Sequence, residues 1–385
     1  MTRPRPRSAR VAVSGIFALN GALLANWIAR IPAVKSQLAL SDADLGLALL
    51  GLAVGALLAF PIAGWSIGRF GSRRVMVLSL LLMCAALPAA ALAPSLPLLA
   101  LALVFLGAGN GATDVAMNAQ AVEVEKAYRQ PILSSFHAMW SLGSLLGAGT
   151  GGLLAGAGIE PLSHFLLVAA VVALGVALVR PRLLQSAPRA AAGPIFSRPP
   201  RALLGVGLLI FGAAIGEGAM ADWGAVYLRD ELGTSEAFAA AGYAAFAGAM
   251  LVGRLLGDAL TTRWGAVGMA AQGGLVAALG LSFSLLAAAP WAVLVGFAGV
   301  GWGLASAFPL AFGAAGNTPG MNEGVALAAV ATMGYGGFLL GPPLIGFLAE
   351  ATSLQLALWA VVASTLMVTA LSPSLRRSKR EDDPA

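Results

Sequence analysis

Long stretches of apolar residues, broken by short polar segments, dominate the pattern along this chain. Each stretch has about the length of roughly 20 residues that an α-helix needs to cross the hydrocarbon core of a bilayer. The apolar runs are continuous and do not alternate over about ten residues, which favours helices over the strands of a membrane barrel. The pattern predicts twelve transmembrane helices, at residues 11–30, 45–67, 75–93, 98–120, 133–156, 163–179, 202–227, 238–260, 267–288, 290–312, 324–348 and 353–371.

The composition agrees with a lipid environment. Hydrophobic residues make up 59% of the 385 positions and charged residues only 10%, whereas a soluble domain has about 25% charged residues. The chain therefore has too few polar side chains to cover a water-soluble globule, and we predict an all-α membrane protein. The first apolar run lacks a clear small-residue cleavage site and contains Asn20 and Asn26, so we expect a membrane helix there and not a signal peptide.

Positive charges predict the orientation in the membrane. If the N-terminus is inside, 20 of the 23 Lys and Arg residues fall on inner segments, and only Arg30, Lys35 and Arg229 fall outside. The positive-inside rule explains this distribution without a nucleic-acid partner. We therefore expect a multi-pass protein of the cytoplasmic (inner) membrane, with both termini cytoplasmic.

An internal repeat predicts two halves. Three pairs of segments match at nearly one spacing, 192 residues for the first pair and 194 for the other two; they are FLGAGNG at 105–111 with FAGVGWG at 297–303, MWSLGSLLGAGTGG from Met139 with MGYGGFLLGPPLIG from Met333, and RFG at 69–71 with RWG at 263–265. A common spacing over separated helices is stronger evidence than one match, although Gly and Leu are common enough in membrane helices to align by chance.

The repeat runs in the same direction in both halves, which places an axis along the membrane normal and a binding site between the halves near the midplane. We predict an N-terminal six-helix half at 1–179, a Pro- and Arg-rich cytoplasmic linker at 180–201, and a C-terminal six-helix half at 202–385. Both halves have a ladder of glycines at helical spacing, which allows close helix packing. The ladders are Gly143, Gly147 and Gly151 in the first half and Gly337 and Gly341 in the second.

These features resemble the major facilitator superfamily. The segment GWSIGRFGSRR at 64–74 is similar to the family's loop Gly-x-x-x-Asp-Arg-x-Gly-Arg-Lys/Arg, except that Gly68 stands at the Asp position. The resemblance implies twelve helices in two parallel halves and alternating access. Four further stretches resemble a bacterial branch near the fucose-permease-like sugar transporters; they are RIPAVK at 30–35, SSFHAMWSLG at 134–143, GRLLGD at 253–258 and GYGGFLLGPPLIG at 334–346.

An acid in the fourth predicted helix is the leading candidate for function. Asn110, Asp114 and Asn118 are four residues apart and form one polar stripe on a helix. A charged group at membrane depth costs several kcal/mol unless it faces water or a partner. The resembling branch has a functional acid in this span, which Asp114 matches, but it also has an acid in the first span, where the polar residues of this chain are Asn20 and Asn26. We expect Asp114 to bind solute or the coupling proton; the alternative is a structural hydrogen bond between helices.

Other polar residues extend the candidate site. Glu217, flanked by glycines in the seventh span, is a second candidate for a proton or cation. The remaining candidate ligands, each also compatible with ordinary packing or bracing, are Asn20, His137, Trp140, Gln272, Trp302 and Tyr335. For the inner gate we expect Arg69, Arg254, Asp258 and Arg263, and for the outer gate Asp222, although these charges also have simpler explanations as markers of the membrane surface.

The candidate chemistry is transport and not catalysis. One cysteine and two histidines do not support a metal site, and no nucleotide-binding motif or nucleophile–base pair is visible. We expect no enzyme activity and no cofactor, and a monomer in the bilayer that binds a small-molecule substrate. The predicted function is proton-coupled uptake of a sugar or related metabolite; proton-driven efflux of amphipathic compounds and a non-transporting receptor or sensor are the alternatives.

Overall fold

The computed structural model describes residues 6–128, 132–185, 203–316, 318 and 323–376. The regular structure of this described part is helical throughout, which agrees with the predicted all-α class. Eleven helical segments of this part are long and apolar enough to cross a membrane; residues 236–257 and 259–287 count separately, and residues 290–315 count as one. The predicted span 133–156 forms α5 (Leu133–Gly156), a helix of 24 residues rich in Gly and Ser that is not among those eleven. The count of twelve spans therefore stays a prediction.

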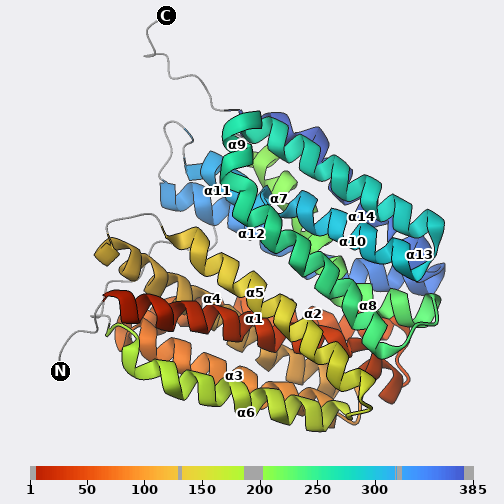
Figure 1. Ribbon diagram of the computed structural model, residues 1–385, viewed down its shortest axis with the longest axis horizontal. Helices are drawn as coiled ribbons and strands as arrows, with labels where there is room; N and C mark the ends of the chain where they lie inside the picture. The colour runs from red at the N-terminus through yellow and green to blue at the C-terminus, as the bar shows by residue number, and fades with distance from the viewer. Residues whose placement is uncertain (1–5, 129–131, 186–202, 317, 319–322, 377–385) are drawn as a thin grey trace, which may run out of the picture.

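The first six helices pack together in the lower part of Figure 1, and we call them the N-terminal bundle. In this bundle α1 packs against α5 and α6, and α4 packs against α2 and α3. The helices are α1 (Pro6–Gln37), α2 (Asp42–Phe70), α3 (Ser72–Leu92), α4 (Leu96–Tyr128), α5 and α6 (Pro161–Val179).

The later helices form the C-terminal bundle, in the upper part of Figure 1. Here α9 packs against α10 and α14, and α7 packs against α12 and α14. The elements are α7 (Leu204–Asp222), α8 (Gly224–Val226), the short π-helix η3 (Tyr227–Glu231), α9 (Glu236–Ala287), α10 (Pro290–Leu304), α11 (Ala307–Gly316), α12 (Glu323–Ala351), α13 (Leu354–Ala357), α14 (Trp359–Leu371) and η4 (Ser372–Leu375).

Two predicted spans meet within α9. Residues 238–260 and 267–288 are separated at Gly265, whose φ of 70° and ψ of 164° are not helical. A positive φ at this position suits glycine, because a side chain there is strained. The predicted span 290–312, in contrast, is divided into α10 and α11.

The predicted linker, 180–201, lies mostly outside the described residues. Its first part forms the short 3-10 helix η1 (Arg180–Arg182), after which Gln120 of α4 binds the backbone of Leu184. Gln120 accepts from the Leu184 amide at 3.1 Å and donates to its carbonyl at 2.8 Å. The start of the linker is therefore anchored on the N-terminal bundle.

The two bundles meet mainly through two helix pairs, α2 with α12 and α5 with α9. The sequence repeat matches α2 with the first part of α9, and α5 with α12. Each interface pair is therefore converted into the other by the repeat, as expected for a pseudo-twofold axis between parallel halves.

The glycine ladders lie at equivalent places in the two bundles. A Cβ added at Gly143 of α5 would collide with the backbone of Ala18 in α1, and one added at Gly337 of α12 would lie 2.5 Å from the carbonyl oxygen of Phe211 in α7. Close backbone approach requires glycine at both positions. These contacts place α1 against α5 and α7 against α12.

Candidate functional site

A buried amide joins three helices of the N-terminal bundle. Asn20 of α1 is fully buried, and its Nδ2 donates to Asn110 Oδ1 of α4 at 3.2 Å. Trp140 of α5 donates from Nε1 to Asn20 Oδ1 at 2.8 Å. The close approach of α1 to α5 makes this second bond feasible, because Gly21 lies directly against the Trp140 carbonyl. The structure thus brings together three residues that the sequence predicted separately, and we call them the Asn20 cluster.

Asp114 lies between the two bundles. One carboxylate oxygen, Oδ1, accepts a hydrogen bond from Asn118 Nδ2 at 3.1 Å, one helical turn away. The other, Oδ2, accepts from the Tyr335 hydroxyl of α12 at 3.4 Å. The Tyr335 ring packs on Phe60 of α2, with 4.5 Å between ring centroids. Within the predicted polar stripe of α4, Asp114 therefore has a partner on the C-terminal bundle, whereas Asn110 binds Asn20 of its own bundle.

A second polar contact between the bundles involves Arg254 of α9. Its Nη1 donates to Ser141 Oγ of α5 at 2.8 Å, and its guanidinium lies 6.0 Å from the centroid of the Trp140 ring. A cation over an indole face is attracted by the ring quadrupole. Arg254 therefore contacts the residue that holds Asn20.

Glu217 of α7 is half-buried and lies within electrostatic reach of Arg254. Its Oε1 is buried and has no hydrogen-bond partner among the described residues. An unpaired buried carboxyl oxygen is costly, which favours a functional role over a structural one.

The other predicted ligands are less closely connected. His137 is exposed and meets Phe17 edge-on, with 5.4 Å between ring centroids. Gln272 is exposed on α9 beyond Gly265, and Trp302 is half-buried on α10, which packs against α9. No hydrogen bond within the described part of the chain ties these three side chains to the Asn20 cluster.

Of the three predicted inner-gate arginines, Arg69 and Arg263 are exposed, whereas Arg254 is half-buried between the bundles. Arg69 lies over the rings of Trp65 and Phe70, at 6.0 and 5.7 Å from their centroids, and Arg263 precedes the break at Gly265. The side chain of Asp258 lies outside the described residues. Its pairing with Arg254 or Arg263 therefore stays a prediction.

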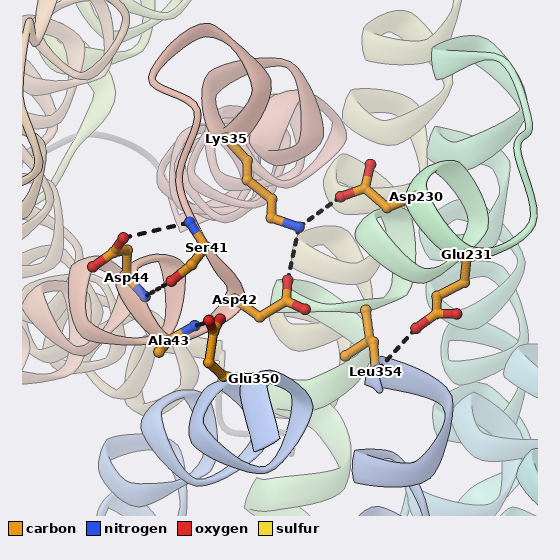
Figure 2. Close-up of polar contacts among 9 residues, drawn as sticks. All are labelled: Lys35, Ser41, Asp42, Ala43, Asp44, Asp230, Glu231, Glu350 and Leu354. Carbon is orange, nitrogen blue, oxygen red and sulfur yellow. Dashed lines mark hydrogen bonds and ion pairs between the residues drawn. The ribbon is translucent and has the colours of Figure 1, made fainter. Parts of the chain in front are cut away.

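Ion pairs close the opposite end of the molecule, which contains the end of α1 and the start of α2. Lys35 Nζ lies 2.7 Å from Asp42 Oδ1 of its own bundle and 2.7 Å from Asp230 Oδ2 of the C-terminal bundle. Figure 2 shows the ammonium group between the two carboxylates. We call this end, which the sequence predicts to be outer, the Lys35 end.

Two further contacts cross between the bundles at the Lys35 end. Arg30 is only 2% exposed and pairs through Nη1 with Glu236 Oε2 at 3.2 Å, while its Nη2 donates to the Ile159 carbonyl at 2.6 Å. The Glu350 carboxylate of α12 accepts from the Ala43 amide in the first turn of α2 at 3.4 Å (Figure 2). An acid at a helix N-terminus is stabilised by the unpaired amides there.

The Lys35 end contains functional candidates that sequence reasoning missed. Asp222, the predicted outer-gate residue, is half-buried at the end of α7 and takes no part in the described ion pairs. The sequence contains one signal for them, because the three basic residues that depart from the positive-inside rule all form ion pairs. Arg30 and Lys35 pair as described above, and Arg229 Nη2 lies 3.4 Å from Glu236 Oε1.

The chain is similar in sequence and in fold to known membrane transporters. A family model described as Major Facilitator Superfamily matches residues 11–315. The chain is 40% identical to the uncharacterized transporter y4wD of Sinorhizobium fredii, over 95% of this chain and 97% of that protein. It is 34% identical to the membrane protein MosC of Rhizobium meliloti, over 96% and 91%.

Solved structures share the fold at low sequence identity. The crystal structure of a D-xylose–proton symporter has a TM-score of 0.74 at 16% identity, covering 95% of this chain and 97% of that one. The nucleoside transporter NupG has a TM-score of 0.70 at 14% identity, covering 96% and 100%. At such identities the likeness concerns the fold alone.

Proposed function

Because the chain belongs to the major facilitator superfamily, we propose that it is a secondary active transporter that imports a small polar organic solute together with protons. The two bundles would expose the site to each side of the membrane in turn. Solute would bind between them, near the Asn20 cluster and Glu217, and Asp114 would take up and release the coupling proton.

The hydrogen bond between Asp114 and Tyr335 is the observation on which this proposal rests. It joins α4 of one bundle to α12 of the other at 3.4 Å, so it forms or breaks when the bundles move. A hydroxyl donates a stronger hydrogen bond to a carboxylate than to a neutral carboxylic acid. Protonation of Asp114 would therefore weaken a contact between the bundles, which couples proton binding to their relative position.

The character of the solute follows from the Asn20 cluster. Amide and indole groups bind hydroxyl-rich or flat, partly polar molecules through a few directed hydrogen bonds and an apolar face. The similar structures include transporters whose names specify D-xylose with protons and nucleosides. We therefore propose a sugar or related metabolite as the solute class.

The test is uptake into proteoliposomes with and without a pH gradient. Wild type is expected to accumulate solute only when the gradient is present. Asp114→Asn keeps the shape and a weaker, neutral hydrogen bond from Tyr335 but cannot titrate, so it should lose accumulation and keep solute binding and exchange. Glu160→Gln, which alters an exposed acid at the start of α6, is the matched control and should accumulate solute as wild type does.

Continued accumulation by Asp114→Asn would reject Asp114 as the coupling residue and make Glu217 the next residue to test. The direction of transport is tested separately in vesicles of known orientation. Accumulation only in inside-out vesicles would indicate efflux, and solute binding without flux in either orientation would indicate a receptor.

A further inference from the structure

The Lys35 end contains an arrangement that the proposed site does not use: one lysine shared by two acids, one in each bundle. Lys35 lies in the last turn of α1, and its side chain is 13% exposed. Asp42 lies at the start of α2 in the same bundle, and Asp230 lies in η3 of the other bundle. Both carboxylates are 2.7 Å from the ammonium group.

The two contacts are not equivalent. Asp230 belongs to the other bundle and accepts a hydrogen bond from Lys35, whereas Asp42 belongs to the same bundle as Lys35 and forms an ion pair with it. Asp42 is also held in place independently of Lys35. Ser41 caps α2 by accepting from the Asp44 amide at 3.1 Å, and Asp44 accepts in return from the Ser41 amide at 3.4 Å (Figure 2). This capping box fixes the first turn of the helix.

We infer that Lys35 is the latch of the Lys35 end and that the two acids have opposite effects on it. Asp230 holds the latch closed, because its ion pair with Lys35 exists only while the bundles are in contact there. Asp42 favours opening, because it stays with Lys35 when the bundles separate and keeps the ammonium group paired. The inference rests on the proposed alternating movement of the bundles, but its test measures distance and not transport.

Asp42 changes the free energy difference between the open and closed states in two ways, and both favour the open state. Without Asp42, the open state would leave Lys35 without an acid, while the closed state would retain Asp230. The closed state also brings two carboxylates toward each other across one cation, and like charges in proximity repel. Removal of Asp42 relieves this repulsion only in the closed state, so both effects favour closure.

The experiment measures the ratio of open to closed molecules by double electron–electron resonance (DEER) spectroscopy. Spin labels are placed at Ala157 and Leu356, two exposed positions at the Lys35 end, one in each bundle, in a Cys84→Ala background. A Glu236→Gln substitution in all samples removes the ion pairs of Arg30 and Arg229 with Glu236, which raises the open fraction so that shifts in both directions are measurable.

In this background Asp230→Asn should raise the open-to-closed ratio by about twofold to fivefold, the range for a partly exposed ion pair. Asp42→Asn should lower the ratio by a similar factor. In the presence of Asp230→Asn, Asp42→Asn should have no effect, because Lys35 then gains nothing on closure. Glu231→Gln is the matched control, since its carboxylate binds the Leu354 amide within the C-terminal bundle, and it should leave the ratio unchanged.

The latch is rejected if Asp42→Asn and Asp230→Asn shift the ratio in the same direction, or if Asp230→Asn does not change it. A failure of proton coupling would leave these distances unaffected, so the two proposals fail separately. If transport is absent but the opposite shifts are observed, the latch stands and the proposed function does not.

Discussion

Replacement of Gly143 by alanine tests whether helix packing positions the candidate site. Gly143 lies in α5, one turn beyond Trp140, and an added Cβ would collide with the carbonyl oxygen and Cα of Ala18 in α1. Asn20, which accepts the hydrogen bond from Trp140, is only two residues beyond Ala18. The substitution should therefore force α1 away from α5 at the place where the two helices share that hydrogen bond.

The expected cost follows from the contact. A backbone carbonyl cannot rotate away as a side chain can, so the collision should cost about 3 kcal/mol, the upper end of the range for overpacking. Loss of the hydrogen bond between Trp140 and Asn20 adds about 1 kcal/mol. Alanine also gains about 1 kcal/mol over glycine in helix propensity. The net destabilisation of Gly143→Ala is then about 3 kcal/mol.

Gly149→Ala is the matched control, because an added Cβ there meets nothing within 4 Å in the same helix. Gly149→Ala gains helix propensity without causing a collision, so it should stabilise the protein by up to about 1 kcal/mol. The two variants should therefore differ by about 4 kcal/mol. The assay is equilibrium unfolding in mixed micelles, with solute binding measured on the folded fraction. Equal free energies of unfolding for the two variants would refute the packing argument.

Two further predictions concern Arg254 and the predicted linker. Arg254→Gln removes the contact with Trp140, the charge-assisted hydrogen bond to Ser141 and the positive charge near Glu217, so solute affinity should fall more than for Ser141→Ala, which removes only the hydrogen bonds of Ser141 to Arg254 and to the His137 carbonyl. Isothermal titration calorimetry measures both losses of affinity, and equal losses would exclude a further role for the Arg254 charge. Ser186→Cys, in a Cys84→Ala background, should be labelled by an impermeant maleimide only in inside-out vesicles. Labelling in intact cells would contradict the predicted orientation.

The helices were predictable because the bilayer imposes a length and a composition on each span. The interruptions inside spans were not, since they depend on local backbone geometry. The predicted span 290–312 provides an example, because it is divided into α10 and α11. The break at Gly265, in contrast, lies between two predicted spans, and Gly71, its counterpart in the repeat, likewise has a positive φ, of 83°.

The residues of the candidate site could be predicted from the sequence, but the contacts that they make between helices could not. Spacing on one helix placed Asn118 beside Asp114, and this pairing is present. Contacts between distant helices, such as Tyr335 with Asp114, depend on how the bundles pack. The acids of the Lys35 end are not predictable for another reason: Asp42 begins α2 and Asp230 lies in the short η3, both next to connections between spans, where charged residues are expected simply because water is near.

The contacts between the bundles have a common consequence. One contact joins Asp114 of α4 to Tyr335 of α12, and the other joins Lys35 of α1 to Asp230 of η3. Both contacts are formed in the same conformation. If the bundles move as units, separation at the Lys35 end breaks the second contact and strains the first. A proton on Asp114 then acts on the same equilibrium as the latch, although their charged groups belong to separate contacts. In the proposed transporter, a double substitution of Asp114→Asn with Asp230→Asn should therefore raise the open-to-closed ratio by about the product of the two single effects, because separated contacts contribute additively to one free energy.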